Sequence, residues 1–331
     1  MNTRMLRAAA AACVTLAFAS QLRSADLALP KDGWVSWEVD AVEDAPVWCC
    51  WKSWDQNVPE GASCNLDRDN GNFGSRDRST TDKARVYARL ADGKVERLRV
   101  LSASCPVETA TPIQTVTTTT DDSARWLIAL SKNGHTTSGD PRENVLAGLA
   151  MHRGDVAYNE LAARARNDAS LDTRQKAVFW LAMLRGTAGA KVVTDLMFND
   201  DHAGLRQHAA FAVTQSRSPT IATDLIKLGN TDKDGNVRGQ AWFWLAHSGA
   251  AESEAAIKAA LKKDPDPTVR EQAIFALSRL PDERGTRALI MAAEDQSLSN
   301  EQRKRAVFWL AQSESKDAQA YLEKVLIGNR R

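Results

Sequence analysis

The sequence predicts a mainly α-helical protein: an α-α superhelix of about six antiparallel helix pairs, preceded by a small β-rich domain that contains disulfides. Three observations predict this fold class. A phrase that begins with arginine recurs six times, at an interval of 32 residues, in the C-terminal two thirds of the chain. The segment before it alternates apolar and polar residues, as half-buried strands do. That front segment also holds four cysteines.

The repeat is defined by columns of equivalent residues. Its arginines are regularly spaced, with one slip of a single residue before the last: Arg142, Arg174, Arg206, Arg238, Arg270 and Arg303. Residues three and seven places after each arginine are apolar and share one helical stripe. A second apolar column has the same interval: Leu161, Val193, Leu225, Ile257, Leu289 and Leu322. This period predicts stacked helix pairs, each burying its apolar face on the next.

The arginine-led helices have predictable starts. Four residues before the arginines stand Ser138, Ser170, His202, Asp234, Asp266 and Ser299. All but His202 are favourable N-caps. Asp266 is followed by Pro267, which suits the first helical position, and Ser299 with Gln302 has the spacing of a capping box.

A ladder of charged pairs is predicted along the stack. An arginine beside a buried stripe needs a carboxylate partner. Aspartates stand six residues before four of the arginines, which predicts the pairs Asp168 and Arg174, Asp200 and Arg206, Asp232 and Arg238, and Asp264 and Arg270. Such pairs are charge-assisted, and neighbouring repeats could share them. The alternative is a set of solvated loop charges.

Six residues after each arginine, large and small side chains alternate: Gly148, Trp180, Ala212, Trp244, Ala276 and Trp309. We interpret this column as core packing, in which each tryptophan fits against a small residue of its neighbour. The alternative is a row of exposed aromatic side chains that binds a ligand.

The N-terminus has the features of a secretory signal peptide. Arg4 and Arg7 precede an apolar stretch that ends in Ala17-Phe18-Ala19, a small-residue cleavage site. We therefore expect three parts: a signal peptide at 1–19, a β-rich domain at 20–120 and a solenoid at 121–331. The mature protein is expected to be exported, either periplasmic or secreted, without a membrane-spanning helix.

The four later cysteines are expected to form disulfides, because export places them in an oxidising compartment. Adjacent cysteines seldom pair with each other. Cys49 and Cys50 should therefore each bond one of Cys64 and Cys105, and the sequence leaves open which. A metal or haem site is the alternative, although zinc-type ligand spacing is not present.

The front segment has strand and turn patterns. Residues 34–39 alternate at period two, and the runs 85–90 and 95–100 flank Ala91-Asp-Gly-Lys94, which is typical of a hairpin. The threonine-rich stretch 109–120 is either an edge strand or an extended linker. Residues 122–132 are predicted to form a helix that covers the first repeat.

These motifs resemble a known family. The phrases at 174–182, 237–246, 264–277 and 303–310 resemble HEAT repeats, and they are most similar to the phycobilin-lyase type found in exported bacterial proteins. The resemblance implies a right-handed superhelix whose second helices line its concave side. It does not imply one activity, because such repeats serve scaffolds, adaptors and a few lyases.

Few residues indicate chemistry. The acidic turn at Asp67, Asp69 and Asn70 lacks the final glutamate of a calcium loop, so it is interpreted as a surface turn. The five histidines follow no metal-ligand pattern. With 43 basic and 42 acidic residues, the chain lacks the charge of a nucleic-acid binder. No cofactor and no metal are predicted.

The leading functional hypothesis is a non-enzymatic scaffold or adaptor of the cell envelope that binds a protein or peptide. Its expected binding residues lie on the second helices: Lys191, Asp195, Phe198, Lys227, Lys262, Arg287 and Met291. One alternative is an enzyme or cofactor-handling protein with a site in the cysteine and tryptophan cluster 48–54. Another is an envelope protein that self-associates through the terminal repeat near Leu322.

Overall fold

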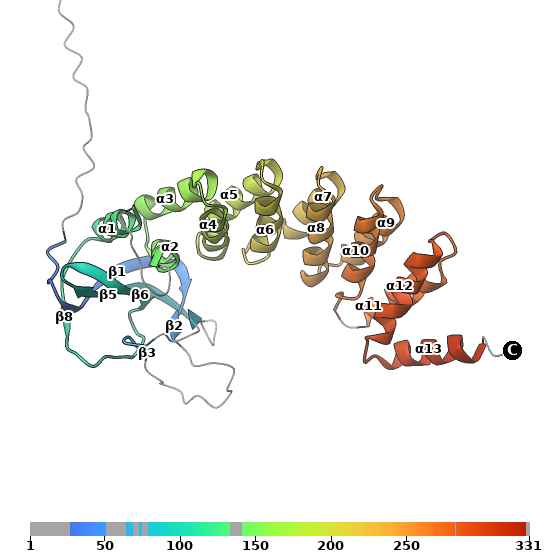
Figure 1. Ribbon diagram of the computed structural model, residues 1–331, viewed down its shortest axis with the longest axis horizontal. Coiled ribbons are helices and arrows are strands. Elements are labelled where there is room, and N and C mark those ends of the chain that lie inside the picture. Colours follow the sequence, from blue (N-terminus) through green and yellow to red (C-terminus); the bar gives the residue numbers. More distant parts are fainter. Residues whose placement is uncertain are drawn as a thin grey trace, which may run out of the picture.

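The structure, a computed structural model, describes residues 27–50, 64–68, 73–74, 79–132, 141–281 and 283–328. The expected signal peptide at 1–19 lies outside these residues. The described part is mainly helical, with a small sheet at its N-terminal side followed by a row of helix pairs (Figure 1). The predicted fold class is confirmed.

A four-stranded sheet forms the front of the molecule, in the order β6-β5-β1-β8. Its strands are β1 (Gly33–Pro46), β5 (Thr80–Ala91), β6 (Lys94–Ser102) and β8 (Ile113–Thr115). β5 and β6 form the predicted hairpin, with Asp92 and Gly93 at positive φ in its turn. β8 pairs with β1, so part of the threonine-rich stretch is an edge strand. Four short strands complete this region: β2 (Cys49–Cys50), β3 (Cys64–Asn65), β4 (Phe73–Gly74) and β7 (Val107–Glu108).

β1 is buried on both of its faces. Since successive side chains of a strand point in opposite directions, Val35 and Trp37 join the core of the helices, whereas Trp34 joins a second cluster around the cysteines. Helices α1 (Thr120–Lys132) and α2 (Pro141–Met151) pack on the sheet. The sheet therefore covers the N-terminal end of the stack, whose apolar side would otherwise be exposed.

The solenoid contains six helix pairs within the described residues. The arginine-led helices are α2, α4 (Leu171–Leu184), α6 (Ala203–Val213), α8 (Gly235–His247), α10 (Pro267–Leu277) and α12 (Asn300–Ala311). The second helices are α3 (Asp155–Asn167), α5 (Gly186–Asn199), α7 (Ile221–Thr231), α9 (Ser253–Lys263), α11 (Arg284–Glu294) and α13 (Lys316–Gly328).

The N-caps of the arginine-led helices are formed as expected wherever the structure describes them. Ser170, Asp234 and Asp266 each accept a backbone N–H of their helix, and Ser299 completes the capping box with Gln302. His202 is also a cap, because its Nδ1 accepts the N–H of Gly204 at 3.2 Å. Ser138 lies outside the described residues.

The helix pairs stack into an arch, and its inner side is lined by the arginine-led helices. In Figure 1, α5, α7 and α9 lie along the outer edge, and α4, α6, α8 and α10 lie inside them. The expectation that the second helices line the concave side is therefore wrong for this chain. The reason is the small residue three places after each arginine: fully buried alanines, such as Ala209 and Ala241, let the inner helices approach closely.

A buried histidine joins the sheet to the first helices. Trp37 Nε1 donates to Ser123 Oγ at 2.7 Å, and Ser123 Oγ donates to His152 Nε2 at 2.8 Å. His152 Nδ1 then donates to the carbonyl of Gly148 at 2.7 Å. Burial lowers the pKa of His152 to about 4. The neutral ring therefore has a partner on each nitrogen and connects β1, α1 and α2.

Candidate functional site

A buried ladder of arginines and aspartates runs between neighbouring helix pairs. Arg206 donates from Nε and Nη2 to both carboxylate oxygens of Asp232, at 2.8 and 2.9 Å. Its Nη1 donates to the carbonyl of Asp200 at 2.9 Å. Arg238 repeats this arrangement, with the carboxylate of Asp264 at 2.8 and 2.9 Å and the carbonyl of Asp232 at 3.0 Å. Arg174 pairs with Asp200 in the same way along the stack.

The pairing differs from the one drawn from the sequence. Each of these arginines binds the carboxylate of the aspartate 26 residues after it, and not of the aspartate six residues before. The cause is the turn that each aspartate makes. Asp232 ends α7, and its Oδ1 accepts the N–H of Asp234, the next N-cap, at 2.8 Å. That turn directs the carboxylate toward the preceding helix pair, while the backbone carbonyl of Asp232 remains for Arg238.

The ladder ends at its two outer members. Asp168 binds Arg164 of its own helix at 3.1 Å. Arg270 donates to the carbonyls of Asp264 and Pro265, and no carboxylate pairs with it among the described residues. The slip before Arg303 explains this end, since it shifts the next aspartate, Asp295, by one residue. Asp295 binds Lys262 instead, at 2.7 Å.

The ladder is a structural element. The side chains of Arg206 and Asp232 are only 2% and 4% exposed, so a ligand has no access to them. Burial raises the pKa of Asp232, but the hydrogen bonds from Arg206 and Asp234 and the guanidinium charge outweigh it and hold that pKa below its ordinary value. The hydrogen bond to Asp232 raises the pKa of Arg206. Both groups are therefore charged at neutral pH.

A continuous row of aromatic rings runs along the arginine-led helices, and we call it the ring row. Its members lie on five consecutive arginine-led helices: Phe179, Trp180, Phe211, Phe243, Trp244, Phe275, Phe308 and Trp309. Neighbouring ring centroids are between 4.8 and 6.1 Å apart along the whole row. At its N-terminal end, Trp180 contacts Trp48 of the front domain at 5.6 Å.

The ring row borders the core without being inside it. All its members are half-buried except Phe308, which is 47% exposed. The alanines of the alternating column, Ala212 and Ala276, are fully buried. The tryptophans of that column thus pack on the core with one part and remain accessible with another, which combines features of both interpretations of the sequence.

Basic side chains and imidazoles contact the ring row. His208 lies 5.7 Å from the ring of Phe211, and His247 lies 4.3 Å from that of Phe243. The guanidinium of Arg279 lies 4.7 Å from Phe275 and 5.9 Å from Trp309, and that of Arg305 lies 5.9 Å from Phe308. Cations over aromatic faces are favourable contacts. They also make the border of this apolar strip positive.

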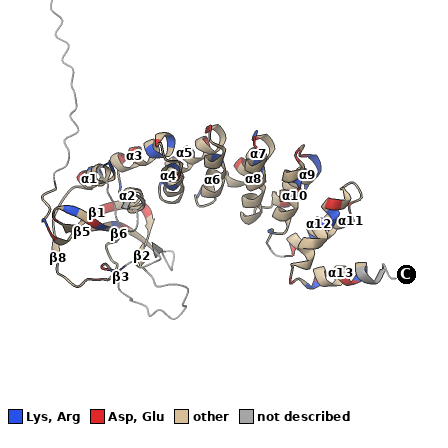
Figure 2. Ribbon diagram, viewed as in Figure 1, with Lys and Arg blue, Asp and Glu red and all other residues tan. Residues whose placement is uncertain are grey.

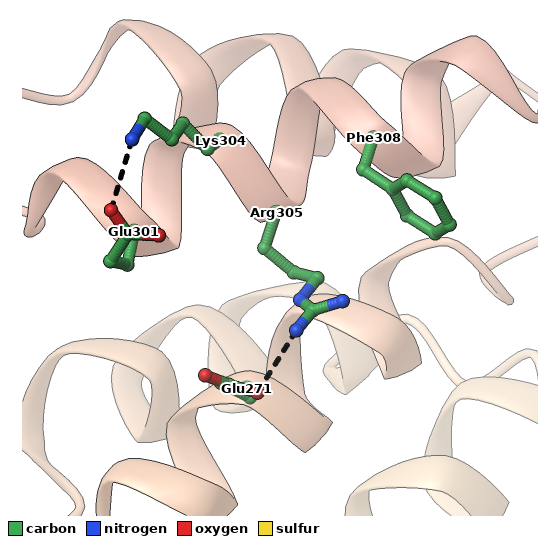
Figure 3. A pocket seen from close by; sticks show the side chains of 5 residues that line it. All are labelled: Glu271, Glu301, Lys304, Arg305 and Phe308. Carbon is green, nitrogen blue, oxygen red and sulfur yellow. Dashed lines mark hydrogen bonds and ion pairs between the residues drawn. The ribbon is translucent and has the colours of Figure 1, made fainter.

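The C-terminal end of the ring row opens into a hollow of about 220 Å³ between α10 and α12. Figure 3 shows its lining: Glu271 and Arg305 approach each other across the two helices, Glu301 pairs with Lys304, and Phe308 lies beside them. The ion pairs are 3.4 and 3.0 Å long and largely exposed. Such surface pairs are weak, so a ligand can displace them at little cost.

The binding residues expected from the sequence lie on the outer edge. Lys191 and Asp195 belong to α5, Lys227 to α7, Lys262 to α9, and Arg287 and Met291 to α11; all are exposed, and Phe198 is half-buried. Lys227 lies over the ring of Phe198 at 4.4 Å, and Lys262 binds Asp295. Figure 2 shows both signs of charge interspersed along these helices. They form a mixed surface without a continuous apolar strip.

The front domain contains two disulfides. Cys49 bonds Cys105, and Cys50 bonds Cys64, which decides between the pairings that the sequence left open. Residues 51–63, which include most of the tryptophan cluster, lie outside the described residues. Asp67 accepts hydrogen bonds from Trp34 Nε1 at 2.8 Å and from the N–H of Ala110 at 2.6 Å. Those two partners give it a structural role in the turn.

Two general searches covered only the residues that the structure describes. They contain no group of three or more potential ligands that could hold a metal ion. None of their helices is both long and apolar enough to cross a bilayer.

The stacked helix pairs define the chain as an α-solenoid. Residues 222–302, from α7 into α12, match the family of HEAT repeats, and the same helix pair recurs on both sides of this segment. The chain is therefore a HEAT-repeat protein. No curated protein has a significant match to its sequence.

Two solved structures are similar to this chain. Human deoxyhypusine hydroxylase in complex with glycerol has 20% identity and a TM-score of 0.35, over 56% of this chain and 69% of the other. YibA of Escherichia coli has 19% identity and a TM-score of 0.37, over 57% of this chain and 69% of the other.

The phenylalanines of the ring row were missed in the sequence. They stand five residues after the arginine in five consecutive repeats: Phe179, Phe211, Phe243, Phe275 and Phe308. Their regular spacing was a visible signal. Their contacts were not visible, because each ring touches rings that are about one repeat away in the sequence.

Proposed function

We propose that this HEAT-repeat protein is an exported, non-enzymatic scaffold that binds a protein or peptide partner along the ring row. HEAT repeats suggest a protein-interaction scaffold in general. The observation that carries the proposal is the unbroken contact of half-exposed rings from Trp180 to Phe308. Aromatic side chains and arginine are enriched at protein interfaces, where they contribute most of the binding energy.

Affinity capture with matched variants tests the binding surface. The first variant, Phe243→Gln with Phe308→Gln, interrupts the ring row, and the second, Lys191→Glu with Lys227→Glu and Lys262→Glu, reverses charge on the outer edge. We expect the wild type and the outer variant to retain the same partner from a native extract, and the ring-row variant to lose it. Loss in the outer variant alone would move the site to the second helices. Capture that neither variant changes would refute both surfaces.

The two disulfides support export, because such bonds persist in oxidising compartments and are rare in the cytosol. Intact-mass measurement on protein from its native compartment tests this part of the proposal. We expect a chain that begins at Ser20 and has no free thiol. Free Cys49 and Cys50 would contradict it and favour the cofactor-handling alternative. A dimeric mass in solution that Leu322→Lys abolishes would favour the self-associating alternative.

A further inference from the structure

We infer that the ring row selects an extended acidic peptide, with Arg279 as the main group that receives its carboxylates. This inference depends on the proposed function and adds the chemical class of the partner. It starts from the middle of the row, where Phe243 and Phe275 are stacked, with centroids 5.6 Å apart and planes inclined by 12°. His247 lies against the first ring and Arg279 against the second.

Arg279 is exposed and prepared for an anion. Its guanidinium lies over Phe275, and within the described residues no carboxylate pairs with it and no acceptor takes a hydrogen bond from it. A guanidinium has five N–H donors in a planar fork that matches a carboxylate. Stacking on a ring limits the orientations of that fork before a ligand arrives, so less conformational freedom is lost on binding.

His247 offers a second polar group beside the same rings. Its Nδ1 donates to the carbonyl of Phe243 at 2.9 Å, which leaves Nε2 directed to a ligand on this exposed side chain. Arg305, at the end of the row, is held only by a 3.4 Å contact with Glu271, and the two side chains are 46% and 53% exposed. The groups that contact the rings are thus basic residues or imidazoles.

The outer edge lacks this charge preference. There Lys262 is neutralised by Asp295, and Lys258 by Glu254. The complementary partner of the ring row is a chain that places carboxylates beside apolar side chains. Basic peptides would leave Arg279 opposed by like charge.

The shape of the row requires an extended partner. It is a single line of rings, with steps of 4.8 to 6.1 Å across five helices. An extended chain advances by about 3.3 Å per residue, so about a dozen residues follow the row. A helix of the same length is about 18 Å long and would contact only part of it.

Three labelled peptides of twelve residues test the inference by fluorescence anisotropy. They consist of four triplets of Glu-Phe-Pro, Gln-Phe-Pro or Lys-Phe-Pro, in which proline keeps the chain extended. We expect the glutamate peptide to bind about tenfold more tightly than the glutamine peptide, and the lysine peptide to bind most weakly. Added salt should reduce the difference between the first two.

Two arginine variants locate the charge selection. Arg279→Gln should weaken the glutamate peptide by about tenfold and leave the glutamine peptide unchanged. The matched control Arg287→Gln, an exposed arginine on the outer edge, should bind all three peptides like the wild type. Circular dichroism of both variants checks that they fold.

The outcomes separate the inference from the proposed function. Equal binding of the glutamate and glutamine peptides would overturn the acidic preference and leave the ring row as a peptide surface. Failure of all three peptides to bind would overturn both. Loss of selectivity in Arg287→Gln and not in Arg279→Gln would also overturn the inference. So would equal displacement of the glutamate peptide by oligothymidylate of the same length, since that indicates unspecific binding of polyanions.

Discussion

The ladder predicts a large difference between two arginines at equivalent positions. Arg206 binds the carboxylate of Asp232 with two hydrogen bonds, and both side chains are almost completely buried. Arg270 binds only two backbone carbonyls. Replacing each by methionine keeps an unbranched chain and removes the guanidinium.

The expected magnitudes follow from what each substitution leaves behind. In Arg206→Met, the buried carboxylate of Asp232 keeps only the N–H of Asp234, so the free energy of unfolding should fall by about 3 to 5 kcal/mol. In Arg270→Met no buried charge is left unpaired, and the loss should be about 1 kcal/mol. Adding Asp232→Asn to Arg206→Met should recover part of the loss, because the amide oxygen can still accept the N–H of Asp234.

Urea unfolding followed by far-ultraviolet circular dichroism measures these differences. Because a solenoid can open from one end, hydrogen exchange of α7 and α8 should be measured as well. Losses in Arg206→Met and Arg270→Met that agree within about 0.5 kcal/mol would refute the reasoning. So would a double variant less stable than Arg206→Met alone.

Two further predictions concern buried contacts. His152 has a folded pKa of about 4, below its ordinary value, so the unfolded chain binds the proton first. Stability should therefore decline as the pH falls from about 6.5 to 4, by up to about 3 kcal/mol, and the decline should be smaller in His152→Gln, as urea unfolding at several pH values can measure. Gly229→Ala should destabilise the protein by about 1 to 3 kcal/mol, because its Cβ would lie 2.5 Å from the ring of Trp242. Gly204→Ala, where the nearest atom is a movable histidine ring at 3.3 Å, is the thermal-unfolding control and should be close to neutral.

Much of the fold was predictable from local patterns. The arginine and leucine columns located the helix pairs, and Asp234, Asp266 and Ser299 marked helix starts, because capping involves residues two or three places apart. His202 shows the limit of residue-type preferences, since a histidine there acts as the cap. The candidate site was less predictable: residues on the second helices were expected to line the concave side, and the ring row lies on the other helices.

The sequence alone determined the repeat, the helix starts, the front hairpin and the set of cysteines, because each depends on neighbours along the chain or on one helical period. Only the tertiary structure decided that Arg206 binds Asp232, that Cys49 bonds Cys105, and which helices line the inner side. These choices depend on the distance between helix pairs and on the direction of each turn. Every aspartate of the ladder has two polar groups, a carboxylate and a carbonyl, and packing directs them to different arginines.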